Sequence, residues 1–360
     1  MSQISKNNYI SIAKALGIIL MVIGHSGCPD VLSRLLYLFH MPLFFLCSGY
    51  FFKDISDTHT LTTFCKKKVK GLYLPYLKWS LFFLLLHNFL FRIDIYNTFS
   101  HSYLYNSTDY LRQLVKTVTM TDYELLIRPF WFIKELLFSS ILIAFISFLH
   151  SKLFPKLSNE IILVIMFFVT IACKSTDLCL PILGDCSVLT FCAVYFYSGI
   201  VFHKFENRIP VNFTTTSIAS LVILIGSYYY TGDIDMRYTT MHNHIPYYFL
   251  SISGILMTFN ISKWLNTKPL NSFLYYIGSH TMPILALNLL ALKVGNFIKI
   301  CIYDMPIEML SSYTIIYEHN RYFWIIYTIV GLSVPLLCSS LYNIIRQNKH
   351  LKEKIIGNSN

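Results

Sequence analysis

Long apolar runs separated by short polar segments dominate the sequence. A helix needs roughly 20 residues to cross a bilayer, and ten runs approach this length. They lie at residues 9–27, 32–52, 72–91, 130–149, 160–174, 188–203, 214–230, 246–261, 272–293 and 322–343, of which the fifth and sixth are short or interrupted. We therefore predict an all-α polytopic membrane protein, folded as a single bundle of about ten transmembrane helices.

The composition agrees with a chain that lies within a membrane. Of the 360 residues, 55% are hydrophobic and only 13% are charged, whereas soluble proteins carry about 25% charged residues. Such a chain has too little polar surface to cover a water-soluble particle of its size. The composition thus excludes a soluble enzyme, a disordered protein and a small disulfide-stapled domain. The first run shows no cleavage site of small residues, so we expect it to be a retained helix.

The distribution of basic residues predicts the orientation. The chain has 29 Lys and Arg against 18 Asp and Glu, a net charge of +11. These basic residues lie mostly at the ends of apolar runs, which is typical of membrane helices and not of a nucleic-acid surface. With the N-terminus in the cytoplasm, 16 fall in cytoplasmic segments and 10 in external ones, including Lys293 and Lys299. We predict that both termini are cytoplasmic, with large external loops at 92–129 and 294–321.

No internal repeat, low-complexity stretch or linker divides the chain. We predict one transmembrane domain over residues 7–343, followed by a basic cytoplasmic tail at residues 344–360. The nine cysteines lie mostly within apolar runs, where they resemble small buried hydrophobic residues. Only Cys179 and Cys186, in one short loop, are placed to form a disulfide. No Cys/His spacing matches a zinc site, so we expect no metal.

Ionisable side chains within membrane spans are candidates for function. Each costs several kcal/mol unless it is paired or faces a cavity. Lys14 and His25 are 11 residues apart in the first span, or about three helical turns, so they share one face and lie roughly 16 Å apart along the axis. The candidates among them are Lys14, His25, His40, Lys78, Lys134, Glu135 and His280.

Four predicted helices place polar groups at a similar depth. Beside His25, the outer thirds of three further spans carry His40, Trp131 with Glu135, and Asn288. This convergence suggests one substrate-binding cavity that opens outward.

Each of these residues also has a structural explanation. A buried His, with His280 the clearest case, can donate to a carbonyl one turn away. Lys134 and Glu135 can form ion pairs with neighbours one turn along the helix. Lys78, near a predicted helix end, can extend its amine to the membrane surface.

Five local strings, in chain order, carry a family resemblance. They are ISIAKALGIILMVIGHSG, YLFHMPLFFLCSGYFF, CKKKVKGLYLPYL, RPFWFIKELLF and YYIGSHTMPILALNLLALK. The sequence resembles the membrane-bound acyltransferase-3 family over about residues 7–343, and particularly its branch that resembles bacterial fucose 4-O-acetylase. The first-helix Lys-x10-His pattern and the FHMPLFF-x-x-SGYFF string are specific together, whereas WF-x-x-x-L alone is weak.

The resemblance implies a multi-pass O-acyltransferase of the bacterial inner membrane. Such proteins take an acetyl group from cytoplasmic acetyl-CoA and place it on a sugar hydroxyl of an envelope or exported glycan. His25 takes the place of the family's essential histidine, and Lys14 takes the place of its paired basic residue. The other matching positions are His40, Pro42, Ser48, Gly49 and Trp131, and the basic segment before the third helix is matched by Lys67, Lys68 and Lys70.

Two positions depart from the family pattern. Ser11 stands where the family often has Asp, three residues before Lys14, and Asn288 stands where it often has His. Asn donates and accepts hydrogen bonds but cannot shuttle protons. The pairing of Lys14 and the role of a second histidine therefore stay open.

Acyl transfer to an alcohol needs a base, donors for the oxyanion and a site for the acyl donor. We expect His25 to be the base, because imidazole titrates near neutral pH. His40, Trp131 and Asn288 are candidates for oxyanion donors or positioning groups. The lysines at 66–70 can bind the phosphates of acetyl-CoA, or they can serve only as an orientation signal. Direct transfer is the simpler route, although Ser26 and Ser48 leave an acyl-enzyme open.

A non-enzymatic function is the alternative. Intramembrane His and Lys residues and the interrupted fifth and sixth spans would suit a transporter of a lipid-linked sugar or small molecule. No inverted half-repeat is visible in the sequence, which argues against this class.

Overall fold

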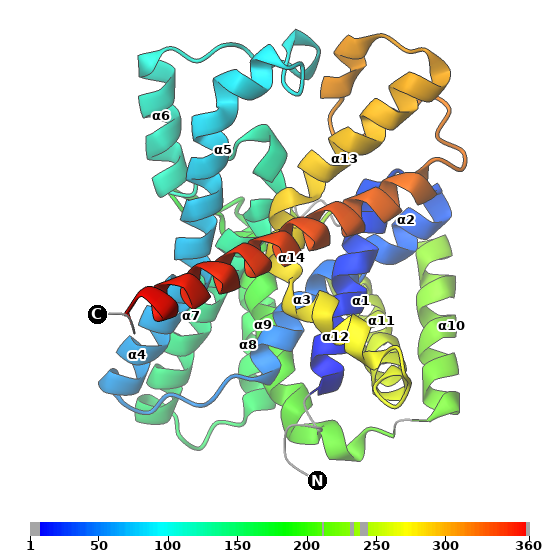
Figure 1. Ribbon diagram of the computed structural model, residues 1–360. Helices are drawn as coiled ribbons and strands as arrows, with labels where there is room; N and C mark the ends of the chain where they lie inside the picture. Colours follow the sequence, from blue (N-terminus) through cyan, green and yellow to red (C-terminus); the bar gives the residue numbers. More distant parts are fainter. Residues whose placement is uncertain (1–7, 211, 231–233, 238–243, 358–360) are drawn as a thin grey trace.

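The computed structural model describes residues 8–210, 212–230, 234–237 and 244–357, with side chains from Tyr9 to Arg346 within these ranges. Apart from a short hairpin of β1 (Cys179–Leu180) and β2 (Gly184–Asp185), the regular elements of the described part are helical. The helices form one bundle, with α14 crossing its front in the view of Figure 1. The predicted all-α class is confirmed.

The α-helices follow in chain order, and each of the ten predicted runs is helical over most of its length. They are α1 (Asn8–His25), α2 (Asp30–Tyr37), α3 (His40–Tyr50), α4 (Thr58–Lys68), α5 (Leu74–Arg92), α6 (Ser107–Val118), α7 (Trp131–Leu153), α8 (Asn159–Ser175), α9 (Cys186–Phe205), α10 (Phe213–Tyr229), α11 (His244–Leu265), α12 (Asn271–Ser279), α13 (Thr281–Tyr303) and α14 (Trp324–Gly357). The chain also contains a π-helical turn, η2 (Val69–Tyr73), and 3-10 turns at η3 (Thr98–Ser100), η4 (Leu125–Phe130), η5 (Glu206–Arg208) and η6 (Ile307–Ser311).

Several helices are long and apolar enough to cross a membrane. Within the described part of the chain there are seven, namely Asp30–Tyr50, Thr58–Arg92, Leu125–Leu153, Cys186–Arg208, His244–Leu265, Thr281–Tyr303 and Trp324–Arg346. Two shorter apolar helices, Tyr9–His25 and Phe213–Tyr229, accompany them. The protein is therefore a multi-pass membrane protein, whereas the number of ten spans and the orientation of the termini stay predictions.

Two predicted spans break into pairs of helices, and each break precedes a proline. α2 and α3 meet at Phe39, and Pro42 is the third residue of α3. α12 and α13 meet at His280, and Pro283 is the third residue of α13. Proline has no N–H and its ring clashes with the carbonyl four residues earlier, so it suits only the first turn of a helix. The predicted second span remains one candidate span, Asp30–Tyr50, with a break inside it, whereas the predicted ninth span, 272–293, is corrected to Thr281–Tyr303.

The basic segment after the second span is helical. α4, η2 and α5 form one helix from Thr58 to Arg92. The wide turn η2 comes just before Pro75, whose ring would clash with the carbonyl of Gly71 in a regular α-helix. Such π turns are frequent at functional sites. Because this helix is longer than predicted, Lys78 lies well inside it and not near its end.

α13 extends well beyond its predicted end at residue 293. Lys293 and Lys299 therefore lie inside the helix, where both are buried, and not in an external loop. The amine of Lys293 donates to the Ser312 carbonyl at 2.5 Å, and that of Lys299 donates to the Ile316 carbonyl at 2.8 Å. These bonds attach the following segment to α13. Lys293 and Lys299 therefore no longer count as residues of an external loop. The predicted cytoplasmic segments then exceed the external ones in Lys and Arg by a larger margin.

Two glycines allow α3 and α9 to approach closely. A Cβ atom on Gly49 would overlap the Phe196 carbonyl, and one on Gly199 would overlap the Leu46 carbonyl. Small residues of this kind let membrane helices pack backbone against backbone. Gly49 therefore has a structural role at the α3–α9 contact.

Glu206, the residue after α9, joins one end of the bundle together. Its carboxylate accepts hydrogen bonds from the hydroxyls of Tyr9 (2.7 Å) and Tyr50 (2.5 Å) and lies 2.8 Å from the Lys263 amine. These partners belong to α1, α3 and α11. One side chain thus fixes the spacing of four helices at the lower end of the bundle in Figure 1.

Candidate active site

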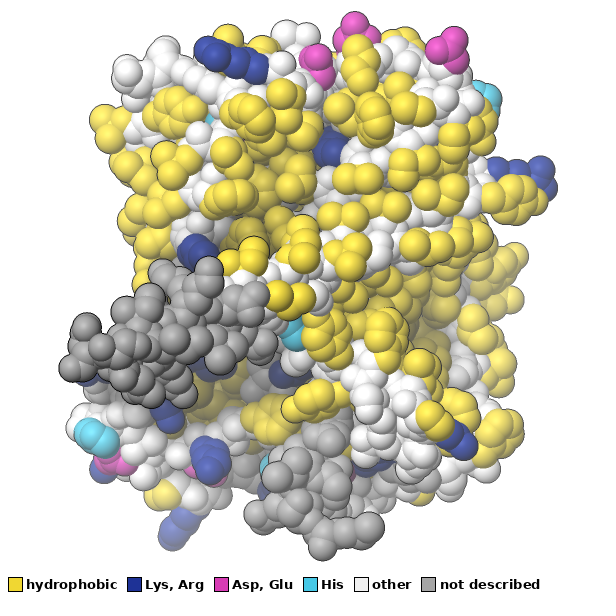
Figure 2. Space-filling model, in the orientation of Figure 1, with side chains coloured by type: hydrophobic (Ala, Val, Ile, Leu, Met, Phe, Trp, Pro, Cys, Tyr) yellow, Lys and Arg dark blue, Asp and Glu magenta, His cyan; other side chains and the backbone are white. Residues whose placement is uncertain are grey.

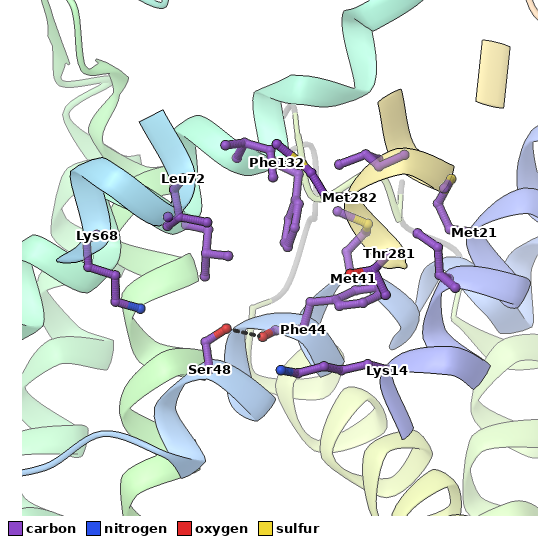
Figure 3. A pocket seen from close by; sticks show the side chains of 15 residues that line it. Lys14, Met21, Met41, Phe44, Ser48, Lys68, Leu72, Phe132, Thr281 and Met282 are labelled. Carbon is purple, nitrogen blue, oxygen red and sulfur yellow. Dashed lines mark hydrogen bonds between the residues drawn. The ribbon is translucent and has the colours of Figure 1, made fainter. Parts of the chain in front are cut away.

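A cavity of about 280 Å³ lies among α1, α3, the α4–α5 helix, α7 and α13 (Figure 3). Its volume is close to the lower end of the usual range for small-molecule sites, about 300–1,000 Å³. Most of its wall is apolar, so a few polar groups decide what binds. The lining residues are Lys14, Ile18, Met21, Met41, Phe44, Ser48, Lys68, Gly71, Leu72, Phe132, Ile133, Leu136, Thr281, Met282 and Leu285. We call this the central cavity.

Irregular helical turns form much of the wall of the central cavity. Met41 lies in the first turn of α3, Gly71 lies in η2, and Met282 lies in the first turn of α13. Each adjoins a point where a proline interrupts the regular helix. The sequence analysis missed these residues, although the prolines that follow them are the signal that could have located the breaks.

Two lysines make one end of the central cavity positive. The amines of Lys14 and Lys68 both point toward Ser48 (Figure 3) and interact electrostatically with each other. Among the described residues that line the cavity, none is acidic. The Ser48 hydroxyl donates to the Phe44 carbonyl at 2.9 Å, which leaves its oxygen free to accept. Two ammonium groups in a largely apolar enclosure attract an anion.

The three lysines of the predicted phosphate-binding segment differ in position. Lys68 lines the central cavity and is half-buried, with its amine over the rings of Phe64 (5.2 Å) and Phe196 (5.4 Å). Lys67 and Lys70 are exposed and do not line the cavity. Of these three lysines, only Lys68 is placed to contact a ligand in the central cavity.

One face of α1 connects the central cavity to His25. Lys14, Ile18 and Met21 line the cavity, and His25 is the next residue of α1 at the same helical spacing. Because α1 is one unbroken helix, the common face predicted for Lys14 and His25 is confirmed. His25 is half-buried, is the last residue of the helix, and lies one turn beyond the cavity lining.

His40 lies near His25, and the two imidazoles interact electrostatically. Nδ1 of His40 is 2.7 Å from the Leu36 carbonyl. Since a carbonyl only accepts hydrogen bonds, Nδ1 carries the hydrogen, and Nε2 of the neutral ring is the acceptor. The ring of Tyr37 packs edge-on against His40, with centroids 5.0 Å apart. His280 makes the same bond to the Tyr276 carbonyl at 2.8 Å, as its structural explanation predicts.

Glu135 and Trp131 lie away from the central cavity. Glu135 is buried beside Asp185 and Cys192. Within the described part of the chain, its Oε2 has no hydrogen-bond partner and neither it nor Lys134 forms an ion pair. Trp131, half-buried at the start of α7, packs edge-on against a phenylalanine of the cavity wall. The central cavity therefore does not gather the predicted outer groups together.

Asn288 lies where α1, α13 and α14 meet. A Cβ atom on Gly331 would be 3.1 Å from its Nδ2 and 2.8 Å from Val22, which is one turn before His25. Asn288 is fully buried, and neither its Nδ2 nor its Oδ1 has a hydrogen-bond partner among the described residues. An unsatisfied buried amide costs about 1–3 kcal/mol. The side chain thus holds unused hydrogen-bonding capacity near the end of α1.

The sequence was compared with models of known protein families, and one family matches nearly the whole chain. The acyltransferase-3 family, described as an acyltransferase domain, matches residues 7–342. No curated protein and no solved structure matches the chain. The matched region includes every helix that lines the central cavity and both ends of the α1 face. The protein is therefore a membrane-embedded acyltransferase and belongs to the acyltransferase-3 family.

Proposed function

We propose that the protein transfers an acetyl group from cytoplasmic acetyl-CoA to a sugar hydroxyl of an envelope or exported glycan, as in the branch of the family that resembles fucose 4-O-acetylase. The observation that carries this proposal is the face of α1. At one end Lys14 and Lys68 supply positive charge to a cavity, and at the other end His25 interacts electrostatically with His40. An anionic acyl donor and a neutral alcohol need these two environments.

The lysine end suits the acyl donor. Phosphates bind to ammonium groups as point charges, and the apolar wall between Lys14 and Met21 suits an extended thioester arm. With the termini in the cytoplasm of a bacterium and the protein in its inner membrane, Lys14 faces the cytoplasmic side and His25 faces outward. The donor then enters from the side on which acetyl-CoA is made.

The histidine end suits the alcohol. As the hydroxyl oxygen bonds to the thioester carbon, His25 takes the hydroxyl proton. When the C–S bond breaks, the sulfur leaves with the electron pair and is protonated by the imidazolium. His40 and Asn288 supply hydrogen-bonding groups at the His25 end. Ser48 lies at the lysine end and belongs with the donor, while Trp131 and Glu135, outside the central cavity, stay predicted contacts of the acceptor.

Replacement of His25 tests this function. Purified His25→Ala protein should lose acetyl transfer by about 100-fold or more, which is the usual contribution of a general base. His59→Ala removes an exposed histidine of α4 and serves as the matched control, which should retain full transfer. Both variants are compared at equal inserted amounts, with surface-glycan acetylation as the cellular measurement.

Two results would contradict the proposal. Unchanged transfer by the His25→Ala protein would remove His25 from the chemistry. Movement of a sugar across liposomes without any acyl donor, with no acetylated product when the donor is added, would favour a transporter.

A further inference from the structure

A second cavity, of about 330 Å³, lies between α5, the junction of α12 and α13, and α14. We call it the lateral cavity. Its polar groups are not used in the proposed acyl transfer, and Met282 lines both this cavity and the central one. The lining residues are Lys78, Trp79, His280, Met282, Pro283, Leu287, Cys338, Ser339, Tyr342 and Asn343.

Lys78 lies within a lipid-facing stripe of α5. The apolar side chains of Leu74, Phe82, Leu85 and Phe89 are 50%, 46%, 76% and 57% exposed. Together with Lys78 they recur at the spacing of one helical face. Large exposed apolar side chains on a membrane-spanning helix contact lipid, so the ammonium of Lys78 interrupts a surface that otherwise meets acyl chains.

The other wall of the lateral cavity also borders lipid. On α14, Leu337, Leu341 and Ile345 are 61%, 59% and 68% exposed. Apolar side chains predominate on the surface along the part of α14 that Figure 2 colours by type. The mouth of the lateral cavity is therefore flanked by lipid-facing residues on both sides.

The charge of Lys78 lacks a counter-charge. Among the described residues, no carboxylate lies within ion-pair distance of its amine. The amine instead lies 5.6 Å from the ring centre of Tyr342 and 6.0 Å from that of Trp79. Such ring contacts offset only part of the cost of an isolated ammonium within a membrane. A bound anion would supply the counter-charge that the ammonium of Lys78 lacks.

A second nitrogen group lines the lateral cavity. His280 uses its Nδ1 to donate to the Tyr276 carbonyl at 2.8 Å. In the neutral ring Nε2 is therefore an acceptor, open to a hydroxyl group of a ligand. The Tyr342 hydroxyl and the Asn343 amide add hydrogen-bond donors on the α14 side. The ammonium and the neutral donors suit phosphate oxygens, and the imidazole nitrogen suits a headgroup hydroxyl.

We propose that the lateral cavity binds the phosphate headgroup of an anionic phospholipid. Lys78 contacts the phosphate, Nε2 of His280 accepts a hydrogen bond from a hydroxyl of the headgroup, and the adjoining apolar wall at Pro283 and Leu287 contacts an acyl chain. The lipid-facing stripe of α5 begins at Leu74, one turn before Lys78, and the lysine-rich segment precedes it. The cavity thus lies at the basic end of the lipid-facing surface, where anionic headgroups gather.

Retention of lipid by the purified full-length protein tests this site. Native mass spectrometry measures how much phosphatidylglycerol and phosphatidylcholine stay bound after detergent exchange. The wild-type protein should retain phosphatidylglycerol preferentially. Lys78→Met should reduce this retention about fivefold, because one Lys near a membrane surface contributes about 1 kcal/mol of attraction to anionic lipid. Lys78→Arg should preserve it.

The control removes the same charge elsewhere. Lys152→Met replaces an exposed lysine in the last turn of α7 and should leave the retention of phosphatidylglycerol unchanged. Thermal unfolding of each variant shows that it is folded, and Lys78→Arg tests the charge even where the Met variant is unstable.

Three retention patterns would overturn the proposal. They are equal retention of phosphatidylglycerol by the wild-type protein and folded Lys78→Met protein, equal retention of the two lipids by the wild-type protein, and loss of retention in Lys78→Arg. Displacement of phosphatidylglycerol by inorganic phosphate or CoA would also overturn it, since the ligand would then be a soluble phosphate. The measurement uses no acyl donor, so its outcome does not depend on the function of His25.

Discussion

Lys68 differs from the neighbouring lysines in its surroundings. It lines the central cavity and interacts with Lys14, whereas Lys67 is exposed on the same helix. Replacement of Lys68 by Met should raise KM for acetyl-CoA about tenfold, because a hydrogen bond to a charged group contributes about 1.5–3 kcal/mol. The turnover number should change little, since the amine contacts the donor far from the bond that breaks. Steady-state kinetics with acetyl-CoA as the varied substrate measure both quantities.

Lys67→Met is the matched comparison for this prediction. It removes the same charge one residue away. Because salt in the solvent screens an exposed charge, KM for acetyl-CoA should rise less than about twofold. Equal increases of KM in both variants would mean that the basic segment attracts the donor only through its overall charge. A lower turnover number with unchanged KM in Lys68→Met would place Lys68 in the chemistry instead.

At the level of helices, the contact between α3 and α9 leaves no room for a side chain. The Cβ atom of a Gly49→Ala variant would overlap the Phe196 carbonyl, and backbone cannot move aside as a flexible side chain can. Overpacking of this kind costs about 1–3 kcal/mol. We therefore expect Gly49→Ala to lower the unfolding temperature of the detergent-solubilised protein and to reduce the inserted amount.

Gly71→Ala provides the control at a second glycine. No atom lies within 4 Å of the position that its Cβ would take, and Ala is favoured over Gly in helices by about 1 kcal/mol. The Gly71→Ala protein should therefore unfold at the wild-type temperature or slightly above it. Wild-type stability of Gly49→Ala would show that the two helices can separate at this contact without cost.

At the scale of the whole molecule, hydropathy alone predicts most of the helices. A helix that crosses a bilayer must satisfy its backbone internally and expose apolar side chains, so its sequence is recognisable without knowledge of its neighbours. The breaks at Phe39 and His280 and the π turn before Pro75 are less visible, because a proline indicates a local interruption without showing its form. Lys293, which ends an apolar run, is buried only because a distant carbonyl accepts its hydrogen bond.

The candidate site is predictable from the sequence only where its residues belong to one helix. The shared face of Lys14 and His25 follows from helical spacing within one element, and α1 preserves it. The choice of Lys68 over Lys67 depends on the rotation of the α4–α5 helix against the bundle, which no local pattern contains. The position of Glu135 on the α9 side of α7 depends on the same kind of long-range packing.

Glu206 joins four helices at one end of the bundle, and its contacts yield a prediction with a matched control. Glu206→Gln removes the ion pair with Lys263 and one of the acceptor sites used by Tyr9 and Tyr50. Loss of these charged hydrogen bonds should destabilise the protein by about 1–3 kcal/mol, seen as a lower unfolding temperature. Glu160→Gln breaks an exposed ion pair between α8 and α9, where a cost below about 1 kcal/mol is expected. Equal shifts in both variants would mean that the four-helix junction contributes no more than a surface pair.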